Sequence, residues 1–141
     1  MISVSDQTVT SVHPATVRLP YEPRSAGAAR RMIRNKLVEW RLPVLIDDAE
    51  LIVSELVANA ADTGCQRCMI VAVRRITETT IRILVRDGSR SMPCLIDAGP
   101  NAESGRGMRL VHELSGGHWG ATPEVLGKTI HADLRVKLSA G

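Results

Sequence analysis

Residues 129–138 alternate strictly between apolar and polar side chains. The apolar set is Ile130, Ala132, Leu134, Val136 and Leu138, and the polar set includes His131, Asp133, Arg135 and Lys137. Successive side chains of a β-strand point to opposite faces, so this period of two predicts a half-buried strand. Residues 69–73 and 80–85 are also strand-like, and the polar residues 77–79 between them are typical of a hairpin turn. The chain therefore has to build a sheet that is covered on one face.

Two segments have the spacing of helices that could cover this sheet. Apolar side chains recur at roughly helical intervals in residues 26–41, and Pro43 ends that pattern. A second helix is predicted from Asp47 and Asp48, whose acidic side chains suit a first helical turn. Its core-facing positions are Ala49, Ile52, Val53, Leu56 and Ala60.

The other elements complete an α+β fold. Residues 16–19 and 118–121 are short strand-like segments, and a third helix after residue 104 is stopped by Gly116 and Gly117. The helices form an early pair and one late insertion among the strands. This order predicts a mixed, mostly antiparallel sheet with the helices on one face.

Length and composition favour one small domain with an aliphatic core. Of the 141 residues 44% are apolar, while the aromatic side chains are limited to two Trp and one Tyr. We expect residues 1–14 to form a flexible tail and residues 15–141 to form the domain. The net charge of +3 is spread along the chain without a dense basic block, which argues against direct nucleic-acid binding. The sequence shows neither a membrane span nor a signal peptide, so a cytoplasmic protein is expected.

Glu55 and Asn59 are four residues apart on the second predicted helix, so they share a helix face. The amide oxygen of Asn59 can bind Mg²⁺, which prefers hard oxygen ligands and is often shared with phosphate groups. A carboxylate one turn away can deprotonate a hydroxyl group or a water molecule. A solvated polar helix face would explain the same pair, so the function depends on the rest of the chain.

Asp87 and Gly88 follow the strand-like residues 80–85. A carboxylate at a strand end can accept a hydrogen bond from an exocyclic amine such as that of adenine. Asp-Gly is also a common turn sequence, which is the alternative for this motif alone. Residues 88–104 have no clear period, and a loop of this length in a compact domain is typical of either a functional lid or a disordered segment.

The sequence Gly105-Arg106-Gly107 stands where this loop becomes a helix. Glycines allow close backbone approach, and the free N–H groups at a helix start can bind phosphate. The motif is not a Rossmann fingerprint, because Leu110 occupies the third glycine position, and it lacks the Gly-Lys-Ser/Thr end of a P-loop. An ordinary loop-to-helix joint is the alternative for this motif alone.

In this order, the three segments resemble the motifs of GHKL, or Bergerat-fold, ATPase domains. The resemblance is closest to the anti-sigma factor serine kinases, including stand-alone actinobacterial members, and covers about residues 16–138. The similar stretches are the N box Glu-Leu-Val-Ala-Asn-Ala at 55–60, the adenine box Val-Arg-Asp-Gly-Ser at 85–89, the glycine box Glu-Ser-Gly-Arg-Gly-Met-Arg-Leu-Val at 103–111, and the C-terminal pattern of Leu114, Trp119-Gly120 and Gly127-Lys-Thr129.

The resemblance implies a two-layer α/β sandwich with ATP and Mg²⁺ as cofactors. Asn59 would bind the Mg²⁺ ion, Asp87 beside Gly88 would hold the adenine amine, and Thr129 would lie near the base. The phosphates would be lined by Gly105 and Gly107 with the amides of Arg106 and Met108, and residues 88–104 would form the ATP lid. Glu55 would be the catalytic base that activates a serine hydroxyl on a bound partner.

The expected partner is a regulatory protein, either a sigma factor or an anti-sigma antagonist, and a homodimer is left open. Two departures bear on catalysis. Kinase-competent members of the family carry an arginine directly before the Ser-Gly of the glycine box, where this chain has Glu103, so Arg106 or Arg90 would have to supply the cation at the γ-phosphate. The segment after Asn59 is one residue short and lacks a histidine. A catalytically inactive, nucleotide-dependent protein-binding module is therefore the alternative to a serine/threonine kinase.

Cys65 and Cys68 form a C-x-x-C pair, which can be redox-active or supply half of a zinc site. A thioredoxin-like motif normally opens a helix, whereas a strand-like run follows here. Zinc would need two further ligands, such as Cys94 and a histidine. A small zinc or thiol-redox protein is the second alternative.

Overall fold

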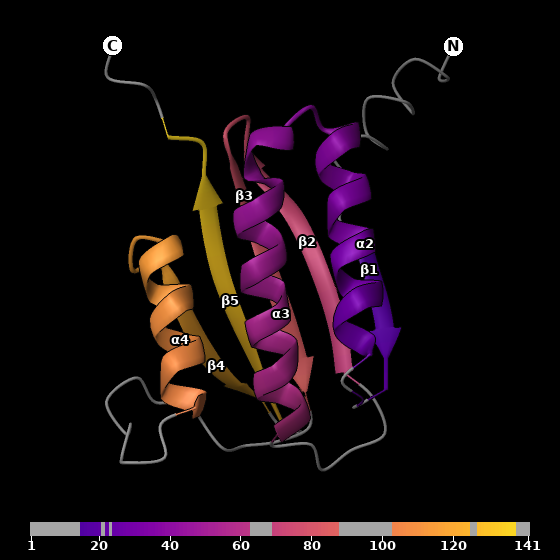
Figure 1. The fold of residues 1–141 in the computed structure, drawn as a ribbon, viewed down its shortest axis with the longest axis vertical. Coiled ribbons are helices and arrows are strands. Elements are labelled where there is room, and N and C mark those ends of the chain that lie inside the picture. Colours follow the sequence, from indigo (N-terminus) through magenta and orange to yellow (C-terminus); the bar gives the residue numbers. More distant parts are fainter. Residues whose placement is uncertain are drawn as a thin grey trace.

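The computed structural model describes residues 15–20, 22, 24–62, 69–87, 103–124 and 127–137. In these residues the chain forms three α-helices, a short 3₁₀ turn and five strands, which Figure 1 shows in sequence colours. In order they are β1 (Ala15–Leu19), α2 (Ser25–Glu39), η1 (Pro43–Leu45), α3 (Ile46–Asp62), β2 (Met69–Thr77), β3 (Thr80–Asp87), α4 (Glu103–Leu114), β4 (Trp119–Glu124) and β5 (Gly127–Arg135).

The strands form a single sheet in the order β1-β2-β3-β5-β4. All four strand pairings are antiparallel. The expectation of an α+β fold with a mostly antiparallel sheet is confirmed, but the described strands contain no parallel pair. The helix α4 lies in the connection from β3 to β4, and β5 then pairs with β3, so the last strand lies inside the sheet and not at its edge.

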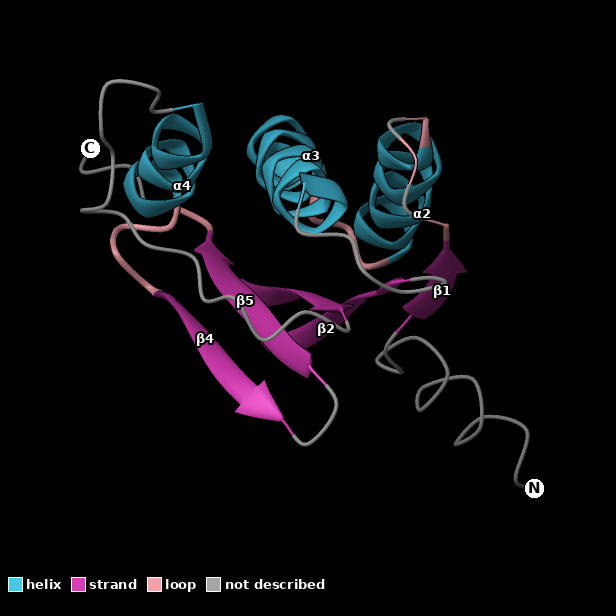
Figure 2. Ribbon diagram, turned by 90° about the horizontal axis from the view of Figure 1, so that it is seen from below, coloured by secondary structure: helices cyan, strands magenta, loops and turns pink. Residues whose placement is uncertain are grey.

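The three helices lie side by side on one face of the sheet, and the other face carries none of the described helices (Figure 2). This is the two-layer arrangement that the sequence predicts. The five core-facing positions predicted for the second helix are all fully buried in α3. The core is aliphatic, and Trp40 is the one aromatic side chain buried in it among the described residues. None of the described helices is long and apolar enough to cross a membrane.

The helix α2 ends without a glycine. Its last turn is closed by two backbone hydrogen bonds, from Leu42 N–H to the Leu37 carbonyl at 2.8 Å and from Arg41 N–H to the Val38 carbonyl at 3.1 Å. This pair of bonds is the Schellman motif, which requires a left-handed residue at its second-last position. Arg41 supplies it with a φ of 61°, a conformation that L-residues other than glycine adopt at an energetic cost.

The helix α4 ends in the same motif with the usual residue. Gly117 N–H donates to the His112 carbonyl at 2.7 Å, and Gly116 N–H donates to the Glu113 carbonyl at 3.2 Å. Gly116 has a φ of 63°, close to that of Arg41. The prediction that these glycines stop the helix is confirmed.

Arg41→Gly is expected to raise the free energy of unfolding by about 0.5–1 kcal/mol, because glycine adopts the left-handed conformation without the clash of a Cβ atom. Urea denaturation monitored by circular dichroism measures the change. Gly116→Ala is the matched control and is expected to lower stability by about 1 kcal/mol. A loss of stability in Arg41→Gly would show that contacts of the arginine side chain outweigh its backbone strain.

Candidate functional site

A buried ion pair joins the end of β3 to the start of β5. Asp87 is the last residue of β3 and stands directly opposite Lys128 in the strand register. The Nζ atom of Lys128 lies 3.4 Å from Oδ1 and 3.3 Å from Oδ2 of Asp87, and neither side chain is exposed to solvent. Charged side chains are rarely buried in this way unless they are paired. The carboxylate predicted to hold adenine thus has a cationic neighbour.

The alternation along β5 explains how Lys128 reaches this position. Lys128 lies in phase with Ile130 and Ala132, which are both fully buried beneath the helices. Lys128 therefore points to the helix-covered face, as Asp87 does. We did not predict Lys128 as a site residue from the sequence, although a signal was present. If the alternation of residues 129–138 is extended back by one position, a lysine stands where an apolar side chain is expected.

The same register determines which face of the sheet Thr129 lies on. This residue is half-buried and is paired across the sheet with Arg86 on β3 and Thr122 on β4. Neighbouring residues of a strand point to opposite faces, so Thr129 lies on the open face while Asp87 and Lys128 lie on the covered one. Thr129 is consequently not beside Asp87, whereas Lys128 is. That Thr129 lies near a bound base stays a prediction.

The helix α3 carries Glu55 and Asn59 one turn apart, as predicted. Both side chains are half-buried and flank the fully buried stripe that faces the sheet. The helix lies between α2 and α4 over the middle of the sheet (Figure 2). A hydrogen bond of 2.9 Å from Arg30 of α2 to Ser54 of α3 ties the two helices together on this stretch.

The helix α4 begins at Glu103. The N–H groups that an α-helix leaves free belong to its first turn, so the amides at the start of α4 are available to an anion. That Gly105 and Gly107, with the amides of Arg106 and Met108, line the phosphates stays a prediction. The Met108 side chain is 1% exposed and belongs to the core, which anchors the first turns of α4 there.

These elements converge at one end of the molecule. Figure 1 shows the C-terminal end of α3, the end of β3 and the beginning of α4 at the same end of the two layers. The three groups brought there are a buried carboxylate, an amide oxygen and a helix N-terminus. They match the chemistry of a nucleotide, which presents a base amine, a phosphate-bound cation and anionic phosphates. The residues present therefore fit ATP and Mg²⁺.

Several predictions lie outside the described residues. These are Gly88, the lid as far as residue 102, Arg90, and the three cysteines on which zinc or thiol-redox chemistry would depend. Residues 103 and 104, assigned to the lid from the sequence, belong to α4. Among the described residues no group of three or more His, Cys, Asp or Glu side chains could hold a metal ion by itself.

The open face of the sheet carries a partly buried histidine. His131 lies between Leu84 and Gly120 in the register, and a Cβ atom at Gly120 would come within 3.0 Å of its imidazole ring. Burial lowers the pKa of His131 below its ordinary value of 6.5, and the nearby charge of Arg82 lowers it further, while Asp133 acts in the opposite direction. Arg82 and Asp133 are themselves joined by two hydrogen bonds of 2.7 and 3.0 Å.

The lowered pKa of His131 predicts a loss of stability in mild acid. The unfolded chain binds the proton more readily than the folded one, so the contribution is fully present above pH 6.5 and is lost as the pH falls through the folded-state pKa. We expect the free energy of unfolding of the wild type to decrease more than that of His131→Gln between pH ~7.5 and ~5. Urea denaturation at a series of pH values measures this decrease. An equal decrease in the free energy of unfolding for the two proteins would contradict the prediction.

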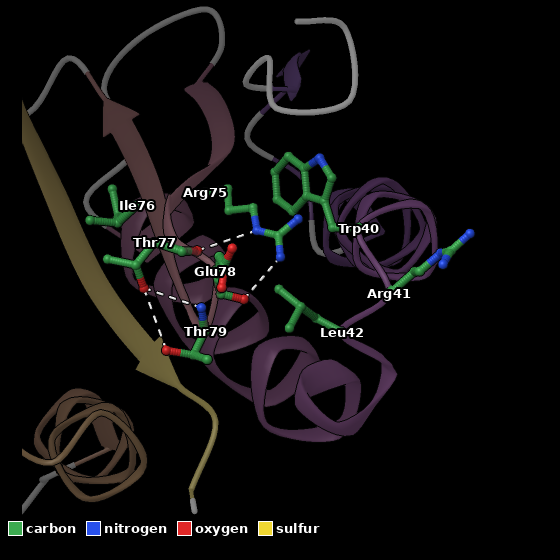
Figure 3. A pocket seen from close by; sticks show the side chains of 8 residues that line it. All are labelled: Trp40, Arg41, Leu42, Arg75, Ile76, Thr77, Glu78 and Thr79. Atoms are coloured by element: carbon green, nitrogen blue, oxygen red, sulfur yellow. Dashed lines mark hydrogen bonds between the residues drawn. The ribbon is translucent and has the colours of Figure 1, made fainter. Parts of the chain in front are cut away.

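A pocket of about 670 Å³ opens at the opposite end of the molecule, beside the turn between β2 and β3 (Figure 3). The guanidinium group of Arg75 lies across it and donates to the carbonyls of Thr77 at 3.3 Å and Glu78 at 2.9 Å. Its other lining residues are Trp40, Arg41, Leu42, Ile76 and Thr79. None of the residues predicted to bind a nucleotide lines it, so it is separate from the candidate site.

Known proteins resemble this chain in sequence and in fold. The family model of the histidine kinase-like ATPase domain matches residues 19–118. Among solved structures the chain is similar to the RsbU and RsbW domains of Rv1364c from Mycobacterium tuberculosis, with 19% sequence identity and a TM-score of 0.66. That match covers 91% of this chain and 34% of the other, so the chain spans about a third of its structural neighbour. No curated protein matches the sequence significantly.

Proposed function

Because the chain belongs to the family of histidine kinase-like ATPase domains, we propose that it is an ATP-binding regulatory protein of the anti-sigma factor serine kinase type. It binds ATP with Mg²⁺ together with a regulatory protein, either a sigma factor or an anti-sigma antagonist. The observation that carries the proposal is the buried carboxylate of Asp87, the last residue of β3. The end of β3 lies at the same end of the molecule as the start of α4 and the C-terminal end of α3, the helix whose last turns include Asn59. The similarity to a structure that contains an RsbW domain supports the fold.

Each group has a distinct task in this proposal. Asp87 accepts a hydrogen bond from the adenine amine, and Asn59 binds the Mg²⁺ ion through its amide oxygen. The free amides at the start of α4 receive the phosphates, and the positive end of the helix dipole favours their charge. The bound metal ion would neutralise part of the negative charge of the phosphates.

Glu55 is the candidate base for phosphoryl transfer. It accepts the proton of a serine hydroxyl on the partner as the serine oxygen bonds to the γ-phosphorus and the bond to the departing β-phosphate oxygen breaks. Its position one turn from Asn59 on α3 brings the base close to the metal ligand. The product would be a phosphoserine on the partner and ADP.

The start of α4 favours a second candidate function, a nucleotide-dependent binding module without kinase activity. Glu103 is the first residue of α4. An acidic residue there stabilises the helix N-terminus, but it also repels the γ-phosphate that this end of the helix would receive. ATP can still bind to such a site if other groups hold the γ-phosphate. Phosphoryl transfer, in contrast, needs a cation beside the γ-phosphate.

Titration calorimetry with ATP and Mg²⁺ tests the binding step, and absence of binding would overturn both candidates. Transfer of labelled γ-phosphate to a candidate antagonist protein tests catalysis. Glu55→Gln is expected to keep the ATP affinity and to reduce transfer by about 100-fold or more, since a general base contributes on that order. Asp47→Asn, an exposed position on the same helix, is the control and should leave both unchanged. ATP binding by the wild type without any transfer would decide for the binding module.

A further inference from the structure

Lys128 is the least expected residue of the candidate site. Its side chain is fully buried, and other β5 residues that point to the same face of the sheet, such as Ile130 and Ala132, are aliphatic. A buried ion pair is a weak source of stability, because removing two charges from water costs about as much as their attraction returns. An aliphatic side chain at this position would continue the core. The presence of a lysine therefore points to a role beyond packing.

The geometry places a hydrogen-bond donor next to an acceptor on one face of the sheet. Lys128 and Asp87 are direct register partners on neighbouring strands, and the ammonium nitrogen lies 3.3–3.4 Å from the carboxylate oxygens. An ammonium group has three N–H donors, so its contact with Asp87 leaves donor capacity for a ligand. Because both side chains are covered, a ligand reaches them only when the covering groups move aside.

The edge of adenine has the complementary order. Its 6-amino group is a donor, and the adjacent ring nitrogen N1 is an acceptor. We propose that Lys128 is a base-binding residue that donates to N1 of adenine while Asp87 accepts from the 6-amino group. This inference rests on the proposed function, since it assigns a second base-binding residue to the same nucleotide site. In guanine the order is reversed, with O6 as acceptor and N1–H as donor, so the pair discriminates against it.

The first test changes the nucleotide and leaves the protein intact. The wild type is expected to bind 1-deaza-ATP, in which carbon replaces N1, about tenfold or more weakly than ATP in calorimetry with Mg²⁺, because a charge-assisted hydrogen bond is lost. The compound 7-deaza-ATP is the matched control and should bind like ATP, since its altered atom is remote from N1. Equal affinity for ATP and 1-deaza-ATP overturns the inference while leaving ATP binding in place.

The second test removes the donor from the protein. Lys128→Met is expected to bind ATP about tenfold or more weakly and to lose the distinction between ATP and 1-deaza-ATP. Lys36→Met, a lysine on α2 beside Trp40, should retain that distinction. If Lys128→Met does not fold, the nucleotide test on the wild type still decides. Failure of the wild type to bind ATP at all would instead overturn the proposed function.

Discussion

Asp87→Asn is expected to abolish ATP binding in calorimetry and to lower the free energy of unfolding by about 3 kcal/mol or more. The first effect follows if the carboxylate is the acceptor for the adenine amine. The second follows because the substitution leaves the ammonium group of Lys128 buried without its counter-charge, and breaking a buried ion pair on one side costs about 3–5 kcal/mol. The distances of 3.3 and 3.4 Å are long for a charge-assisted bond, so we expect the lower part of that range.

The two effects of Asp87→Asn separate in a double variant. Asp87→Asn combined with Lys128→Met removes both charges, and replacing a whole buried pair is often close to neutral for stability. We expect urea denaturation to show most of the lost stability restored, while ATP binding stays absent. Recovery of ATP binding in the double variant would mean that the single substitution acted only through misfolding, and Asp87 would not be a ligand of the base.

Met108→Ala is expected to lower the free energy of unfolding by about 2–5 kcal/mol, the usual cost of truncating a large buried aliphatic side chain. Met108 is 1% exposed and belongs to the core, so the substitution leaves a cavity in the core beside α4. The same residue holds the first turns of α4, where the free amides are proposed to receive phosphate. Denaturation measures the stability, and ATP affinity is expected to fall with it.

Arg109→Ala controls for the loss of side-chain volume on the same helix. Arg109 is exposed, and its truncation is expected to change stability by less than about 0.5 kcal/mol. A similarly small change in Met108→Ala would mean that the core closes over the missing side chain. An unchanged ATP affinity in a destabilised Met108→Ala protein would show that the start of α4 does not depend on this anchor.

The elements of the fold were predictable because their signals are local. The alternation of residues 129–138 and the helical spacing around Ile52 and Leu56 depend only on neighbours in sequence. Ile52 and Leu56 are buried as predicted, and so are the apolar positions of the alternation within β5, which are Ile130, Ala132 and Leu134. The end of α2 was less predictable. Pro43 marked the boundary correctly, but the left-handed residue that closes the helix is Arg41, whose side chain gives no sign of that conformation.

The candidate site was predictable as a set of motifs and only partly as a geometry. Glu55 and Asn59 share a helix face because four residues make about one turn, which sequence spacing alone establishes. The partner of Asp87 depends on how β3 pairs with β5, a register between segments separated by α4 and β4 in the chain. A shift of one residue would exchange Lys128 with Thr129, so motif order could not decide between them.

The sequence by itself determined the elements, their layering and the residue types available for a nucleotide. Periods of two and of 3.6 residues are properties of the local backbone, and burying the resulting apolar faces requires a sheet covered by helices. Only the tertiary structure decided which of these residues meet. Strand register placed Lys128 beside Asp87 and turned Thr129 to the other face, because register depends on contacts between segments distant in sequence.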